Sequence, residues 1–488
     1  MRKLSIISVA ASLLFVNCTK DLSSLNIDPK NSTVAIGSAL FTQGELNFIN
    51  ANTTTSISIA PFRILSQEWT ENTYTNEANY NLAAYNSPNG FWNNLYVNSI
   101  HNMEQAKQQF PSNFTGTAAQ LRNEIIIADI LEVYAYHELT ATYGDVPYSQ
   151  AENPVIPFPA YDDAKGISVD LLLRLDSCIA GLDVSAPAMG AADLMYGGDI
   201  GQWKKFAASL KVKIGMLFAV ADPTTATKAV TEAIATGLFE SNADNALFQY
   251  DPASPTNSNP IWNAIQLSGR HDFLPAELLV NTMDGWNDPR LPLYFTNYPA
   301  NSTTYKGGIA GSPNGYGKYS DFAGGFNSGA GLYDPALPGD LLDYSEQEFN
   351  LAEAAARGFI PDAPDTHYNN AITASIKFWG GSDADATTYL AQPSVAYATA
   401  TGSFQQKIGY QEWISFYNRN WESWTVIRRL GYPDINTVSP PIATQDLFPL
   451  RYYYPPNETT SNSVNAQAAI DKLPGKVDAT IAKLWWEP

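Results

Sequence analysis

The chain has 488 residues, 45% of them hydrophobic, a composition typical of a globular protein with a large core. Its formal net charge of −20 gives a surface that repels phosphate backbones, which excludes nucleic acid as a partner. Only two cysteines are present, Cys18 and Cys178, which excludes a disulfide framework. Because only 16% of the residues are charged, the surface must rely on neutral hydrogen-bonding side chains, which suit uncharged polar ligands such as sugars or peptides.

Residues 1–17 have the pattern of a signal peptide, with a cationic start and an apolar run too short to span a bilayer as a helix. Cys18 follows directly, which predicts lipoprotein processing: cleavage before Cys18 and lipid on its sulfur. Asn17 stands where a smaller residue is usual, so the alternative is an ordinary signal peptide with an incidental cysteine. The polar residues 18–34 are then expected to form a flexible, lipidated tether.

The main body, expected over 35–488, is predicted to be mostly α-helical and to form one large globular domain. Apolar residues at helical spacing predict helices at 91–110, 118–143, 167–182, 201–221, 225–236, 345–358, 367–379, 403–430 and 465–473. The helix over 403–430 is expected to break near Asn418. The scaffold therefore covers about 35–240 and 341–435.

The stretch 251–340 differs from the scaffold, because it is rich in Asn, Ser, Gly, Pro and Tyr and has one clear helical segment, 275–283. Long irregular segments inside compact domains are often functional. We therefore expect this region, with its long irregular loops, to face the ligand.

Several motifs resemble those of the SusD/RagB-like outer-membrane lipoproteins, and of the second SusD-like subgroup in particular. They run in order along the chain: YGDVPYSQA at 143–151, YGGD at 196–199, WKKFAASLK at 203–211, NDPRL at 287–291, AEAAARG at 352–358, WESW at 421–424 and RRLGYP at 428–433. Arg451, Tyr454, Glu458 and Asn462 match the closing motif. The 352–358 segment also resembles the first helix of a tetratricopeptide hairpin.

The resemblance implies a mostly α fold on tetratricopeptide-like helical hairpins. It also implies a surface-exposed protein held to the cell outer membrane by its lipid anchor alone. The implied partner is a TonB-dependent transporter of the SusC type, to which the protein delivers a bound nutrient, an oligosaccharide or a peptide. The class has no known chemistry of its own.

Two segments are candidates for the ligand site, because sugars pack their apolar faces on aromatic rings while amide and guanidinium groups bind their hydroxyls. The first segment, 67–80, alternates rings and amides and supplies Trp69, Asn72, Tyr74, Asn76 and Tyr80. The second, in the irregular region, supplies Trp262, Arg270 and Trp286, together with Tyr305, Tyr316 and Tyr319. For each tryptophan the alternative is a place in the core, which is the expected place for Trp92, Trp203, Trp379, Trp421 and Trp424.

An enzyme is not expected. The four histidines are dispersed, with neither HExxH nor paired-ligand spacing, and no G-x-S-x-G elbow is present. We expect no metal and no cofactor, and we place Cys178 in the core rather than as a nucleophile. The alternative to nutrient binding is a scaffold or adhesion lipoprotein whose helical hairpins bind only protein partners.

Overall fold

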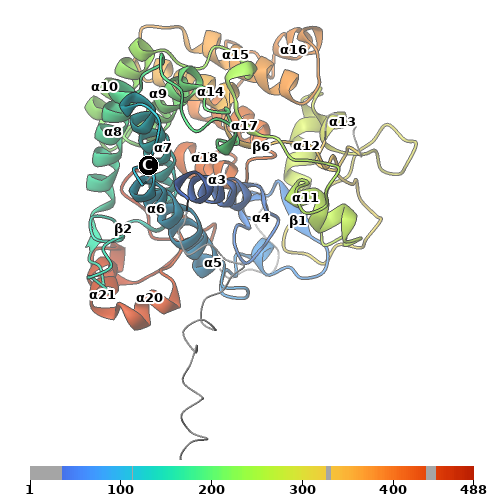
Figure 1. The fold of residues 1–488 in the computed structure, drawn as a ribbon. Helices are drawn as coiled ribbons and strands as arrows, with labels where there is room; N and C mark the ends of the chain where they lie inside the picture. The colour runs from blue at the N-terminus through green and yellow to red at the C-terminus, as the bar shows by residue number, and fades with distance from the viewer. Residues whose placement is uncertain (1–35, 113, 326–330, 436–446) are drawn as a thin grey trace, which may run out of the picture. The chain divides into compact units, whose positions relative to one another are not determined.

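The computed structural model describes residues 36–112, 114–325, 331–435 and 447–488 (Figure 1). The chain divides into two units after Ile36, and the elements described below belong to the second, Gly37–Pro488. The predicted signal peptide, the tether and Cys18 lie outside the described residues. Among the described helices, none combines the length and the apolar character needed to cross a bilayer.

Helices dominate the first half, as the apolar spacing predicts. They are α3 (Gly37–Thr53), α4 (Phe62–Leu65), α5 (Ser87–Asn93), η2 (Asn94–Ile100), α6 (His101–Gln109), α7 (Ala118–Tyr143), α8 (Ala164–Gly181), α9 (Ile200–Leu217) and α10 (Pro223–Thr236). The predicted helix over 91–110 is continued through a π-helical turn, η2. The longest, α7, begins where the Thr117 hydroxyl accepts a hydrogen bond from the Gln120 amide at 3.1 Å. It ends at Gly144, whose φ of +91° suits glycine.

The second half carries α14 (Tyr344–Ala356), α15 (Pro364–Phe378), α16 (Asp383–Leu390), α17 (Phe404–Ser415), α18 (Asn420–Leu430), α20 (Pro456–Ser461) and α21 (Ser463–Ile470). The predicted break near Asn418 is confirmed, since α17 and α18 are separate helices. Consecutive helices pack in pairs, α7 with α8, α9 with α10 and α14 with α15. The mostly α fold with tetratricopeptide-like hairpins is therefore confirmed.

Close approach within one pair depends on a small residue. A Cβ placed on Gly215 of α9 would lie 2.7 Å from the Cβ of Ala229 on α10, so a larger side chain would force the helices apart. Small residues at the contact between these helices thus set their separation.

The core contains the tryptophans predicted for it, and Trp92, Trp203, Trp379, Trp421 and Trp424 are all buried. Cys178 is buried too, as expected.

Buried ion pairs join the scaffold helices. Lys213 of α9 and Arg419 at the start of α18 both contact Glu346 of α14, at 2.9 and 2.6 Å. Arg429 of α18 contacts Glu412 of α17 at 2.8 Å and also Glu353 of α14. Arg419 and the motif residue Arg429 therefore hold scaffold helices together.

The region 251–340 contains short elements only: α11 (Pro260–Trp262), η5 (Asn263–Leu267), β5 (Phe273–Pro275), α12 (Glu277–Gly285), α13 (Leu291–Tyr294) and the start of β6 (Gly339–Leu342). The helix predicted over 275–283 begins two residues later, because Pro275 belongs to β5. Over the described residues the strands form two-stranded ribbons, pairing β1 (Trp69–Glu71) with β5, β2 (Val146–Pro147) with β3 (Tyr161–Asp162), and β4 (Ala246–Phe248) with β6.

Candidate ligand-binding site

The ribbon of β1 and β5 brings the two candidate segments together. The strands are antiparallel, with Trp69 opposite Pro275 and Glu71 opposite Phe273. The Asn72 amide extends the pairing by donating to the Asp272 carbonyl at 2.8 Å. Residues that lie about two hundred positions apart in the sequence therefore share one face of the protein, and a hollow opens on either side of the ribbon's end.

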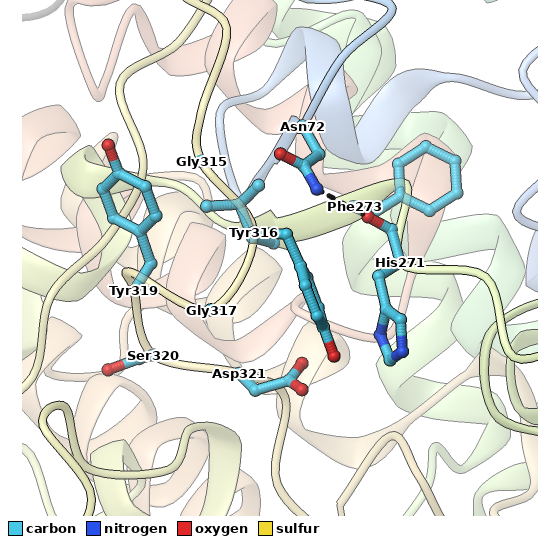
Figure 2. A pocket seen from close by; sticks show the side chains of 10 residues that line it. Asn72, His271, Phe273, Gly315, Tyr316, Gly317, Tyr319, Ser320 and Asp321 are labelled. Carbon is cyan, nitrogen blue, oxygen red and sulfur yellow. Dashed lines mark hydrogen bonds between the residues drawn. The ribbon is translucent and has the colours of Figure 1, made fainter.

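The smaller hollow, of about 130 Å³, lies between the ribbon and the loop that carries Tyr316 and Tyr319. Figure 2 shows Tyr316 and His271 next to each other, with Asn72 and Asp321 at opposite ends of the hollow. The two rings lie with their centroids 4.3 Å apart and their planes 33° apart. Since Tyr316 is nevertheless 64% exposed, its ring is supported by His271 and still offers surface to a ligand.

Polar groups of this hollow are held in fixed orientations. The Asn72 side-chain amide donates to the His271 carbonyl at 3.0 Å. Asp321 Oδ1 accepts from the Tyr333 hydroxyl at 2.6 Å and from the Phe322 amide at 2.8 Å. An aromatic platform with oriented amide and carboxylate groups beside it can bind a sugar ring, because side chains held in place lose little entropy on binding.

The loop that carries Tyr316 is fastened to the ribbon. Asn314 donates from its backbone to the Asn72 carbonyl at 2.9 Å and from its side chain to the Glu71 carbonyl at 3.0 Å. A Cβ on Gly308 would meet Leu274 Cδ1 at 2.4 Å, so a larger residue there would require the Leu274 side chain to move. Tyr316 is therefore presented from an anchored loop.

The larger hollow, of about 550 Å³, lies on the other side of the ribbon. Its lining includes Tyr74, which is 60% exposed, and Tyr85, together with Arg270 and Asp272. Arg270 and Asp272 form an exposed ion pair at 2.6 Å. Phe273 lines both hollows, so a ligand lying across the end of the ribbon could contact both.

A buried carboxyl pair lies behind the larger hollow. Glu71 accepts a hydrogen bond from the Ala78 amide at 3.1 Å, and the neighbouring Glu77 is also buried. Burial, together with the nearby Glu77 carboxyl, raises the pKa of Glu71 to about 9. Burial also raises the pKa of Glu77 to about 7. At neutral pH this pair therefore holds at least one proton.

The structure places the predicted site residues in three different environments. Asn72 lines the smaller hollow, and Tyr74 and Arg270 line the larger one. Asn76 is half-buried just before the short helix η1 (Glu77–Asn79). The linings of both hollows, taken over the described residues, include neither Trp262 nor Trp286, and Trp286 packs edge-on against Tyr410.

Two predictions of exposure are wrong. Trp69 is 2% exposed and Tyr80 is 4% exposed, so neither ring is a surface platform. Trp69 is packed between Phe322, with ring centroids 4.6 Å apart, and the guanidinium of Arg63, 5.1 Å from its ring. The alternation of rings and amides along 67–80 could not reveal this, because β1 is buried on both faces.

His271 and Asp321 line the smaller hollow and were not among the residues predicted from the sequence. His271 directly follows the predicted Arg270, and Asp321 lies two positions after Tyr319, another candidate residue. Their closeness in sequence to these candidates was the one sequence feature that could have indicated them. Tyr85, a further exposed aromatic, lies just beyond the first candidate segment.

Comparisons with known proteins bear on the whole chain. A family model described as "Starch-binding associating with outer membrane", of the SusD-like type, matches residues 29–455. No curated protein matches. Among solved structures, a chitin-binding protein aligns at 25% identity over 93% of this chain and 100% of its own, with a TM-score of 0.77.

Two further structures are similar in fold. A SusD homolog from Bacteroides fragilis aligns at 23% identity over 93% of this chain and 99% of its own, with a TM-score of 0.77. A chitin-binding SusD homolog from Flavobacterium johnsoniae aligns at 22% identity over 91% of this chain and 98% of its own, with a TM-score of 0.75.

Proposed function

The chain belongs to the SusD-like family of outer-membrane-associated binding proteins, and on that premise we propose that it captures a neutral oligosaccharide across the end of the β1–β5 ribbon. Proteins of this family bind nutrients and are not enzymes.

The exposed ring of Tyr316, supported by His271 and flanked by Asn72 and Asp321, is the observation that carries the proposal. An apolar sugar face can pack on the ring while the hydroxyls bond to the amide and the carboxylate. Tyr74 and Arg270 in the larger hollow extend the contact surface to a second sugar residue.

A neutral glycan fits this face better than a charged one. Arg270 is already paired with Asp272, and the Glu71–Glu77 pair is partly protonated at neutral pH. The relative at 25% identity is a chitin-binding protein, so chitin oligosaccharides are the first ligands to test, and starch oligosaccharides the second.

Delivery completes the proposed function. Lipid on Cys18 would hold the protein at the outer face of the outer membrane, and residues 18–34 would tether it there. A SusC-type TonB-dependent transporter would receive the ligand. Mass spectrometry of the mature N-terminus tests the anchor, and copurification with such a transporter, compared between wild type and Cys18→Ser, tests the partnership.

Calorimetry with chitin and starch oligosaccharides, and with a peptide panel, tests the binding face. Tyr316→Ala should weaken glycan binding about tenfold or more, as truncation of a central aromatic contact does. Phe158→Ala is the matched control, because Phe158 is also a large exposed ring but lies outside both hollows. Equal affinity of Tyr316→Ala and wild type, or binding of peptides alone, would overturn the proposal.

A further inference from the structure

A separate groove lies on the helical scaffold. It has a volume of about 310 Å³ and is formed by η4 (Asn242–Asp244) with the residue before it, by the first residue of α14, and by one side of α15. None of its lining residues lines either hollow at the ribbon.

Most of the residues that line this groove have neutral polar side chains, although most of the wall surface itself is apolar. The principal ones are Asn242, Asn369, Asn370, Thr373, Tyr344 and Lys377. Lys377 is the single charged residue among the lining residues, and it forms an ion pair with Asp383 at 2.9 Å. A charged ligand would therefore find no uncompensated charge here, whereas a ligand rich in hydroxyls would find both donors and acceptors.

Two of the asparagines are held in place from behind. The Asn370 side chain donates to Glu348 at 3.0 Å, and Glu348 is itself buried and contacts His367 at 2.9 Å. Asn242 donates to the Ala374 carbonyl at 2.9 Å. Amides fixed in this way are preorganised, so they lose less conformational entropy on binding a ligand than mobile surface side chains do.

An aromatic residue, Tyr344, also lines the groove. The backbone amide of Tyr344 donates to the Asn245 side chain at 2.8 Å, and the ring is half-buried. Burial raises the pKa of Tyr344 to about 12, so its hydroxyl stays neutral and can both donate and accept. The groove is thus lined by one tyrosine, three asparagines and two further hydroxyl-bearing residues, Ser241 and Thr373.

We propose that this groove is a second contact site for an uncharged glycan, distinct from the site at the ribbon. The inference rests on the proposed function, because the same polysaccharide chain would be held at both places. Two weak contacts on one polymer give a higher apparent affinity than either alone, whereas a short oligosaccharide gains nothing from the second contact.

Affinity electrophoresis in gels containing soluble glycol chitin, with chitohexaose calorimetry alongside, tests the inference. Ala243→Trp places a large ring on an exposed position of the groove wall and should fill the groove without disturbing the core. Ala384→Trp, at an exposed position of α16 outside the groove, is the matched control. A second variant, Asn369→Ala, removes an exposed wall amide.

The apparent affinity for glycol chitin, measured from the retardation in the gel, should fall about tenfold for Ala243→Trp and by less for Asn369→Ala. Ala384→Trp should have the affinity of the wild type. Adding Tyr316→Ala to the wild type or to any of the groove variants should weaken chitohexaose binding by the same factor, because the short oligosaccharide binds only at the ribbon. Equal retardation of Ala243→Trp and Ala384→Trp would overturn the second site and leave the ribbon site intact. A wild type that binds neither probe would overturn both.

Discussion

Two arginine–carboxylate pairs, one among the scaffold helices and one just before β5 of the β1–β5 ribbon, have the same length and different surroundings. Arg419 lies 2.6 Å from Glu346, and Arg270 lies 2.6 Å from Asp272. The Arg419 side chain is 2% exposed, whereas that of Arg270 is 65% exposed. Bulk solvent screens the second pair, whereas the first is buried away from bulk solvent.

This difference explains how the fold can support a binding face. Buried pairs such as Arg419 with Glu346 fix helices relative to one another, because either charge left alone would be strongly unfavourable. The exposed pair contributes little to stability and can exchange partners with a ligand. We therefore expect the buried pairs to determine stability and the exposed pair to act in ligand binding, and substitutions at each can test this expectation.

Arg419→Met should give the largest effect. It removes the cation that Asp340, Asp343 and Glu346 share and leaves Lys213 as the remaining partner of Glu346, so we expect the free energy of unfolding to fall by about 3–5 kcal/mol. Chemical denaturation followed by circular dichroism measures it. Arg122→Met, at an exposed position of α7, is the control and should change stability by less than about 0.5 kcal/mol. Similar values for both variants would contradict the argument.

Trp69→Ala should also act on stability. Removing a buried ring packed against Phe322 and Arg63 should lower the free energy of unfolding by about 3–5 kcal/mol. Tyr74→Ala, its exposed neighbour in sequence, should leave stability within about 0.5 kcal/mol of wild type and weaken oligosaccharide binding instead. A Trp69→Ala protein that unfolds like wild type and loses binding would place Trp69 in the ligand site.

Trp69 is buried and Tyr74 is exposed, although both lie in the same candidate segment, so the sequence predicted the elements better than the exposure of single rings. Helices such as α7 and the break between α17 and α18 were predictable, because apolar spacing, caps and breakers are local signals. Rings and amides pointed to the two segments that meet at the β1–β5 ribbon, and ligand binding there stays a prediction. Which ring is buried was not predictable, because the burial of Trp69 depends on β5 and on Phe322, which lie about two hundred or more residues away.

The positions of His271 and Asp321 in the smaller hollow also depend on contacts between distant segments. Neither has a distinctive local pattern, and each gains its place through tertiary contacts, the stacking on Tyr316 and the hydrogen bond from Tyr333. The proposed site depends on the tertiary pairing of β1 with β5, which no single segment of the sequence reveals.

The pH dependence of the ribbon should reflect the carboxyl pair. The pKa of Glu77 is about 7 and that of Glu71 about 9, both above the usual value of 4.5. The folded state therefore binds more protons than the unfolded state above pH 4.5, and stability falls as pH rises through about 7 and on to about 9.

Glu77→Gln should reduce this loss, because it removes one ionisation and keeps the side chain's size. Thermal unfolding of wild type and variant across this range gives the slopes. Glu412 and Glu487, with pKa values raised by burial to about 8 and about 7, titrate in the same range. Hydrogen exchange at residues 72–80, compared between the two proteins at each pH, isolates the local contribution. Identical exchange at every pH would rule out a role for the pair.

Arg270→Gln should have the smallest effect on the fold and a clear one on binding. Its pair with Asp272 is exposed, so the free energy of unfolding should fall by less than about 1 kcal/mol, and by still less in high salt. A guanidinium in the larger hollow can donate to sugar hydroxyls, and losing such a bond should weaken oligosaccharide binding by about threefold to tenfold. Calorimetry and denaturation on the same preparation give both numbers. If Arg270→Gln lost as much stability as Arg419→Met and kept full affinity for the oligosaccharide, the exposed Arg270–Asp272 pair would have a structural role and the proposed role of Arg270 in binding would be wrong.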